Sequence, residues 1–212
     1  MHINCFTNQL FGENTYILWH DEGGAAIVID PGMMRDEERT AVMNFITAHT
    51  LHVQHILLTH CHIDHAFSAS WMATQCGATV AASQADAQWA QAMDFQASMF
   101  HLKLTTEPLT PDQWITAGDK FTLDDEEIAV LATPGHTQGG LSFYIATSGV
   151  VFTGDTLFAG SVGRTDMMGG DHEALIEAIN TQLMVLPDET LVVPGHGPTT
   201  TIGDERRNNP FL

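Results

Sequence analysis

The sequence has 212 residues, of which 44% are hydrophobic and 16% charged, so it is long and apolar enough to bury the core of a globular domain. Its 26 acidic and 7 basic residues give a net charge of −19, which argues against nucleic acid or an anionic membrane surface as a partner. No run of about 18 apolar residues is present. The N-terminus lacks a basic segment followed by an apolar one. We therefore expect neither a membrane-spanning helix nor a secretory signal.

The three cysteines, Cys5, Cys61 and Cys76, are odd in number and irregularly spaced. Such a set does not form a disulfide framework. It favours a reducing compartment, so we expect a cytoplasmic protein. The sequence makes no prediction of the oligomeric state.

The first half of the chain is predicted to alternate strands with helices. Short apolar, β-branched runs indicate strands, and apolar residues at helical spacing indicate helices. Gly77 is expected to end one helix, and Trp89, Met93 and Phe100 are expected to anchor another in the core. The predicted strands are 15–19, 25–29, 53–59 and 79–82, and the predicted helices are 36–49, 66–76 and 84–100.

The second half is also predicted to combine short strands with a helix, although its sequence is unrelated to that of the first half. Asp171 is placed to cap a helix over residues 171–186, whose apolar stripe would face the core. The predicted strands are 121–123, 128–132, 141–145, 150–153 and 191–193. Strand blocks on both sides of the midpoint, each with helices, predict an α+β architecture of two sheets facing each other with helices outside.

A dense group of potential metal ligands follows the strand at 53–59. The segment His60-Cys61-His62-Ile63-Asp64-His65 holds three imidazoles and one carboxylate in six residues. In an extended chain His60, His62 and Asp64 would face one side, with His65 at the start of a helix. Neutral imidazole is a common ligand of first-row transition metals. The pattern therefore indicates a metal site, and a chance histidine-rich loop is the less favoured reading.

Three later segments each place a further ligand after a short apolar strand and next to glycine. These ligands are His136, Asp155 and His196. Loops at strand ends commonly present functional groups on a rigid scaffold. Five histidines and two aspartates exceed the needs of one tetrahedral zinc and suit two metals that share a bridge.

The first segment resembles the His-x-His-x-Asp-His motif of the metallo-β-lactamase superfamily, and the three later residues match its remaining ligands in order. The resemblance extends over nearly the whole chain. It implies a four-layer αββα sandwich, here over residues 1–212 as one domain. It also implies that His60, His62 and His136 bind one metal, that Asp64, His65 and His196 bind the other, and that Asp155 bridges them.

Within this superfamily the chain looks most like glyoxalase II (hydroxyacylglutathione hydrolase) in its short bacterial form. The segments that carry this closer resemblance are 153–158, 163–166 and 201–211. Only 212 − 196 = 16 residues follow His196, so we expect no C-terminal helical domain to bind glutathione. The chain also departs from full-length forms by having Gly197-Pro198 after His196.

The resemblance implies a hydrolase of small-molecule thioesters such as S-lactoylglutathione. Two cations about 3.5–4 Å apart would lower the pKa of a shared water, and the resulting hydroxide would attack the thioester carbonyl. Asp64 or Asp155 would accept a proton during the cycle. Imidazole and carboxylate ligands suit zinc, iron and manganese, and we expect two divalent ions, with zinc favoured.

Other functions compete with this interpretation. Persulfide dioxygenases share the fold and the loop Gly163-Arg164-Thr165-Asp166 but use a single iron, and their last histidine is typically followed by Asp-Tyr. Common zinc β-lactamases have cysteine where this chain has Asp155. Flavodiiron oxygen reductases tend to have glutamate at the position of His62. A metal-binding protein without activity is the non-enzymatic alternative.

Three further features are assigned structural roles. Cys61 lies inside the motif but is expected to turn away from the metals as a buried thiol. Arg164 and Asp166 are expected to form an ion pair that fixes their loop. The other seven histidines have no motif around them and receive no ligand role; they are His2, His20, His49, His52, His55, His101 and His172.

Overall fold

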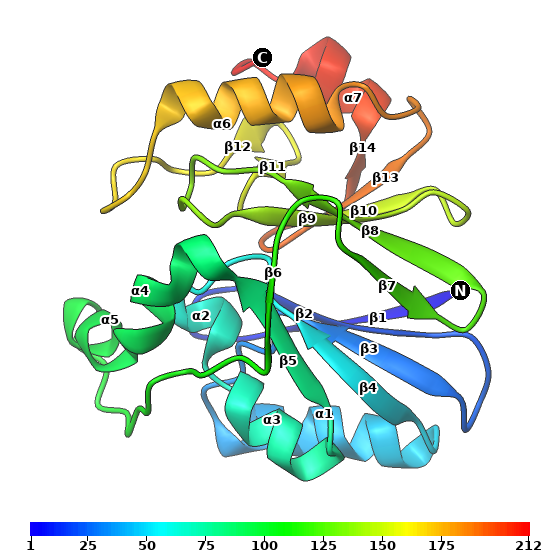
Figure 1. The fold of residues 1–212 in the computed structure, drawn as a ribbon, viewed down its shortest axis with the longest axis vertical. Coiled ribbons are helices and arrows are strands. Elements are labelled where there is room, and N and C mark those ends of the chain that lie inside the picture. The colour runs from blue at the N-terminus through cyan, green and yellow to red at the C-terminus, as the bar shows by residue number, and fades with distance from the viewer. The chain divides into compact units, whose positions relative to one another are not determined.

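The computed structural model describes residues 1–212, and the chain divides into two compact units, Met1–Trp114 and Ile115–Leu212. Each unit is built on a six-stranded sheet with its own helices (Figure 1). None of the helices is both long and apolar enough to cross a membrane.

The sheet of the first unit has the order β1-β2-β3-β4-β5-β6. Its strands are β1 His2–Thr7, β2 Asn14–Trp19, β3 Ala25–Ile29, β4 His52–Leu57, β5 Thr79–Ser83 and β6 Gln113–Ile115. The pairs β1–β2 and β2–β3 are antiparallel, whereas β3–β4 and β4–β5 are parallel. The carboxyl ends of β3 and β4 therefore meet at one edge of the sheet, where the loops after them can combine their side chains.

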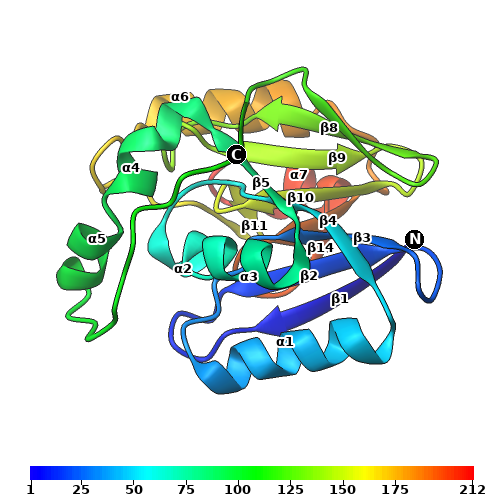
Figure 2. The same cartoon turned by 60° about the horizontal axis from the view of Figure 1, so that its bottom comes forward.

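Helices α1 and α3 cover one face of this sheet (Figure 1). The helices of the first unit are α1 Asp36–Ala48, α2 Ile63–Ala66, α3 Ala69–Cys76, the 3₁₀ turn η1 Gln84–Asp86, α4 Ala87–Gln91 and α5 Met93–Met99. The short turn α2 links the end of β4 to α3, and η1, α4 and α5 continue the chain beyond β5 (Figure 2).

The sheet of the second unit has the order β14-β13-β10-β9-β8-β7. Its strands are β7 Lys120–Leu123, β8 Glu126–Ala132, β9 Leu141–Ile145, β10 Val150–Gly154, β13 Leu191–Pro194 and β14 Thr200–Thr201. Strands β10 and β13 are parallel, and the other pairs are antiparallel. A small hairpin, β11 Leu157–Phe158 and β12 Ser161–Val162, follows β10.

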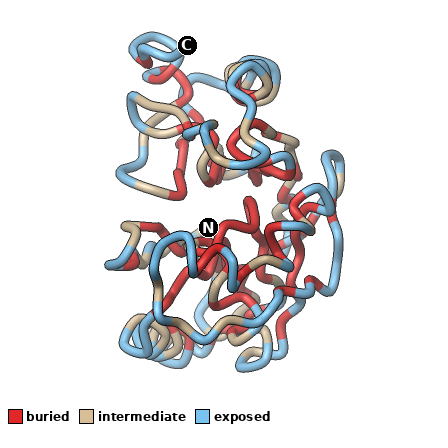
Figure 3. The backbone as a smooth tube through the Cα atoms, turned by 90° about the vertical axis from the view of Figure 1, so that its left-hand side faces the viewer, coloured by how far each residue is buried: buried red, intermediate tan, exposed pale blue.

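Helix α6 His172–Ala178 continues into a π-helical turn η2 Ile179–Leu183, and α7 Ile202–Asn208 comes near the end of the chain. The apolar side chains of these elements pack on β10 and β13. The cluster comprises Val151, Leu157, Leu175, Ile179, Leu183, Val192 and Ile202, all fully buried. In each unit the buried residues gather on the sheet, and the outward faces of the helices are exposed (Figure 3).

All nine predicted strands are present, with small differences at their ends, but several helix boundaries were wrong. The helix expected at 66–76 is interrupted at Phe67 and Ser68, so it begins only at Ala69. Gly77 ends it in the left-handed conformation, as predicted. The helix expected at 84–100 is split into η1, α4 and α5. Phe100 is 38% exposed, so its expected role as a core anchor was wrong, whereas Trp89 and Met93 are buried.

Candidate metal centre

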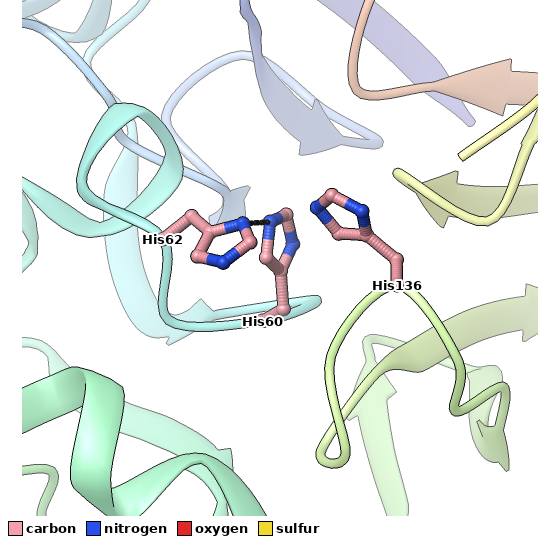
Figure 4. A group of neighbouring side chains, drawn as sticks. All are labelled: His60, His62 and His136. Atoms are coloured by element: carbon pink, nitrogen blue, oxygen red, sulfur yellow. Dashed lines mark hydrogen bonds between the residues drawn. The ribbon is translucent and has the colours of Figure 1, made fainter. Parts of the chain in front are cut away.

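The loop after β4 presents buried histidines at the carboxyl end of the first sheet. His60 and His62 are both buried, and His60 Nε2 lies 3.1 Å from His62 Nδ1. Figure 4 shows their rings pointing toward each other, with His62 at the entry to α2. The expected alternation ends there, because Ile63 begins the helical turn α2. Asp64 and His65 therefore project from a helical turn, and Asp64 does not continue an extended segment.

Asp30 orients His65, a role that the sequence did not single out. Its buried carboxylate accepts hydrogen bonds from the Thr59 backbone N–H at 2.8 Å and the Thr59 hydroxyl at 2.6 Å. The same carboxylate accepts from His65 Nδ1 at 2.9 Å. Because Nδ1 donates, His65 Nε2 keeps its lone pair for a metal. Asp30 has a φ of 50°, a strained conformation for a non-glycine residue that is common at functional sites.

Two buried polar side chains fix the backbone of the histidine segment. Asp86 accepts a hydrogen bond from Cys61 N at 3.0 Å. The Gln96 side chain accepts from Ile63 N at 2.9 Å and donates to Cys61 O at 3.1 Å. Gln96 also donates to Trp89 O at 2.9 Å, which ties the segment to α4. No sequence signal singles out Gln96, because Asp94 and Ser98 are also polar residues of α5 and only the fold shows which of them is buried.

Cys61 is fully buried within this segment, and burial raises the pKa of its thiol. A buried, protonated thiol is neither a good nucleophile nor a good metal ligand. These facts support the structural role expected for Cys61.

The loop after β3 packs tightly against α2. A side chain at Gly32 would place its Cβ 1.6 Å from the Asp64 carbonyl oxygen, so only glycine fits. Glu13 is also buried in this region, hydrogen-bonded to Asn8 and Thr15, and burial raises the pKa of its carboxyl group. The histidine segment is thus supported by a densely packed polar layer.

The second unit carries its own group of ligands. Asp155 follows β10, His136 lies on the loop after β8, and His196 follows β13. Figure 4 also draws His136 on its loop. The Asp155 carboxylate lies between the two histidines: Oδ2 is 3.5 Å from His136 Nε2, and Oδ1 is 3.5 Å from His196 Nε2. Each oxygen of the Asp155 carboxylate thus faces a different imidazole.

The 163–166 loop positions His136 through its backbone. His136 Nδ1 donates to the Arg164 carbonyl oxygen at 2.8 Å, which leaves Nε2 as the acceptor facing Asp155. The Arg164 and Asp166 side chains form the expected ion pair, with Nε–Oδ1 at 2.6 Å and Nη2–Oδ2 at 2.8 Å. Both side chains are exposed, and the Arg164 guanidinium lowers the pKa of Asp166. The pair lies within the loop whose backbone carbonyl accepts the hydrogen bond from His136.

Glycine is also required where this loop meets Asp155. A Cβ at Gly163 would lie 1.8 Å from the Asp155 carbonyl oxygen. Larger residues are therefore excluded unless the backbone that carries Asp155 moves. The close approach explains why the loop begins with glycine.

The donor chemistry of both groups fits transition-metal ions. In the first unit the ring of His60 lies 4.7 Å from that of His62 and 4.1 Å from that of His65, centroid to centroid. Three buried imidazoles this close together would repel one another if protonated, and as neutral ligands they suit a cation. In the second unit two imidazoles face one carboxylate, another set that suits zinc, iron or manganese.

Comparison with known proteins agrees with this donor chemistry. A family model described as the metallo-beta-lactamase superfamily matches residues 9–196. Hydroxyacylglutathione hydrolase GloC of Haemophilus influenzae is 37% identical over 214 residues, an alignment that covers 100% of this chain and 98% of the relative.

Two solved structures are similar over nearly their full length. BLEG-1, described as a B3 metallo-beta-lactamase, superposes with a TM-score of 0.90 at 32% identity and covers 100% of this chain and 99% of that one. TTHA1623 in a di-iron-bound form gives a TM-score of 0.85 at 35% identity, with coverage of 99% and 100%. The predicted α+β metallo-β-lactamase fold is thereby confirmed. The chain belongs to the metallo-β-lactamase superfamily.

Proposed function

We propose that this protein is a dinuclear metal-dependent hydrolase that cleaves thioesters such as S-lactoylglutathione. Two arrangements of candidate ligands carry the proposal. Asp30 orients His65 by a hydrogen bond, and the Asp155 carboxylate lies between His136 and His196. The 37% identity to a hydroxyacylglutathione hydrolase over the whole chain supports the thioester as substrate.

The proposed ligands come from both units. His60, His62 and His136 would bind one metal, and Asp64, His65 and His196 the other. Asp155 would bridge the two ions, in keeping with its two oxygens facing different histidines. We propose two divalent ions per chain, with zinc favoured and iron or manganese also suited to these ligands. The di-iron form of TTHA1623 supports a site for two ions.

The bound ions would supply an activated water and polarise the thioester carbonyl. Asp64 or Asp155 would accept a proton during the reaction. The Asp30–His65 hydrogen bond keeps His65 in the tautomer that offers Nε2. The Gln96 and Asp86 hydrogen bonds keep the segment rigid, so the ligands need little rearrangement during turnover.

A single-iron persulfide dioxygenase is the alternative that the experiment must separate from a hydrolase. Both use histidines of this motif, so ligand types do not distinguish them. Product identity does: the hydrolase releases a thiol and a carboxylic acid without consuming oxygen. A β-lactamase is a further outcome to test, since BLEG-1 carries that description.

We further propose that the whole chain acts as one domain in the cytoplasm, with a small-molecule substrate. All three cysteines are free, which fits a reducing compartment.

The test is a metal-loaded activity screen on S-lactoylglutathione, glutathione persulfide and a cephalosporin, with metal content measured on the same sample. We expect thioester hydrolysis that falls at least about a hundredfold in Asp155→Ala and His62→Ala. His172→Ala is the matched control, because His172 is exposed and has no ligand role. The proposal would be refuted if the metal-loaded protein hydrolysed no thioester, or if it consumed oxygen with glutathione persulfide as substrate.

A further inference from the structure

A cavity lies within the first unit, and none of the seven proposed metal ligands lines it. It has a volume of about 280 Å³ and is formed by α1, the α2–α3 junction and the segment after α5. Its apolar wall includes Phe67, Trp71, Met93 and Leu109, and its polar lining includes Arg39, Ser70, Thr106 and Glu107. A partly apolar cavity with a few convergent polar groups is typical of a small-molecule site.

Arg39 is held rigidly at the edge of this cavity. Its guanidinium carbon lies 4.8 Å from the centre of the Trp71 ring and 5.3 Å from that of Phe67. Its Nε donates to the Ser68 hydroxyl at 2.9 Å. Ser68 in turn donates to the Met33 carbonyl oxygen, so the arginine is fixed to the core by two linked hydrogen bonds.

No carboxylate forms a direct ion pair with Arg39, although the charge of Asp36 acts on it from a longer distance. Lys120, Arg164, Arg206 and Arg207 form ion pairs, whereas Arg39, like Arg35 and Lys103, forms none. The two terminal amino groups of Arg39 donate to no protein atom. Partial burial lowers the pKa of Arg39, and the nearby Asp36 carboxylate only partly offsets this effect. In a chain with a net charge of −19, acidic groups far outnumber basic ones, so an arginine without an ion pair is unexpected.

We propose that this cavity binds a small organic monocarboxylate, with the carboxylate on the terminal amino groups of Arg39 and the apolar body against Trp71 and Phe67. A fixed guanidinium pairs with a carboxylate through two parallel hydrogen bonds. Ser70 and Thr106, two residues with hydroxyl groups, also line the cavity. Glu107 and the acidic surface disfavour a dianion such as phosphate, so a single negative charge is the best fit.

The site adjoins the metal ligands in sequence without including them. Ala66 and Phe67 line the cavity directly after Asp64 and His65. A bound carboxylate would therefore contact the segment that carries two of the proposed ligands. The proposal does not depend on the hydrolase activity, because binding to Arg39 is measured directly.

The test is calorimetric titration of the metal-loaded protein with phenylacetate, compared with phenylacetamide and inorganic phosphate. We expect phenylacetate to bind once per chain, and the neutral amide and phosphate to bind at least about tenfold more weakly. Arg39→Met keeps the stem packing and removes the charge, so phenylacetate should bind at least about tenfold more weakly to it. Arg35→Met is the matched control, since Arg35 is exposed, lies at the start of the same helix and does not line the cavity.

Three results would overturn the proposal. Phenylacetate and its amide could bind equally to the unmodified protein, or phenylacetate could fail to bind up to about 10 mM. The third result is that phenylacetate binds equally well to the unmodified protein and to folded Arg39→Met. The carboxylate would then bind elsewhere, for example to the metals. If Arg39→Met does not fold, Trp71→Leu replaces it, with the same expected weakening. A protein that binds phenylacetate through Arg39 but hydrolyses no thioester would refute only the proposed function.

Discussion

The Asp30 carboxylate accepts a hydrogen bond from His65 Nδ1 at 2.9 Å, and both side chains are almost completely buried. The contact joins the end of β3 to the turn α2 that follows β4, two neighbouring parallel strands. It sets the tautomer of a proposed ligand from a residue that is not itself one of the seven proposed ligands.

Asp30→Asn tests this relationship. The carboxylate accepts from two groups of Thr59 and from His65, whereas one end of an amide cannot accept. We expect metal affinity to fall about 10- to 100-fold, measured by competition with a chromophoric chelator. Asp21→Asn, at an exposed turn, should leave affinity unchanged. Affinity within a factor of two of the unmodified protein, in a folded Asp30→Asn variant, would argue against the role of Asp30.

Gln96→Leu tests how the histidine segment is supported. The substitution leaves Ile63 N, Cys61 O and Trp89 O buried without their partner. We expect a loss of about 3 kcal/mol in the free energy of unfolding. The melting temperature should then fall by about 6–12 °C. Gln88→Leu on the exposed face of α4 should change stability by less than about 0.5 kcal/mol. Equal melting temperatures for the two variants would show that the Gln96 hydrogen bonds contribute little.

Gly163→Ala probes the approach of the 163–166 loop to Asp155. The added Cβ would meet the Asp155 carbonyl oxygen at 1.8 Å, so the backbone that carries the proposed bridging ligand must shift. We expect thioester hydrolysis to fall at least about a hundredfold, because small displacements of reacting groups cost that much. Gly149→Ala has open space around its Cβ and should lose stability, through its positive φ, but keep activity. Full activity of Gly163→Ala would mean that the loop can adjust without moving Asp155.

Thiol labelling tests the place of Cys61. Its side chain is buried and burial raises the pKa of its thiol, so little thiolate is present near neutral pH. We expect iodoacetamide at pH 8 to label exposed Cys5 in the native protein and Cys61 only after unfolding, as mass spectrometry of peptides would show. Rapid native labelling of Cys61 would instead indicate a reactive thiol within the motif.

The candidate ligands are easier to identify in the sequence than the residues that support them. His60, His62, Asp64 and His65 stand together in one motif, so their chemistry is visible without a structure. Asp30 is 35 residues from His65 in sequence, and only the parallel pairing of β3 with β4 brings the two together. In the sequence Asp30 is indistinguishable from any aspartate that ends a strand before a proline-glycine turn.

Predictions from the local sequence pattern were also wrong where tertiary contacts determine the backbone conformation. The alternation expected through Asp64 ends because α2 begins at Ile63, whose N–H is held by Gln96. Strand β1 was not predicted, since its sequence lacks a clear apolar alternation and its residues are only partly buried. Its pairing with β2 fixes it in place. The Asp171 cap was predicted correctly, because the signal is local: its side chain accepts from Ala174 N.

The most direct test of the proposed function is a metal titration of the chelator-stripped protein, with hydrolysis of S-lactoylglutathione measured at each step. The proposal predicts that activity rises to a maximum at two equivalents of metal per chain and that Asp155→Ala stays inactive throughout. Maximal turnover at one equivalent of iron with oxygen consumption, or no thioester hydrolysis at any metal content, would contradict it.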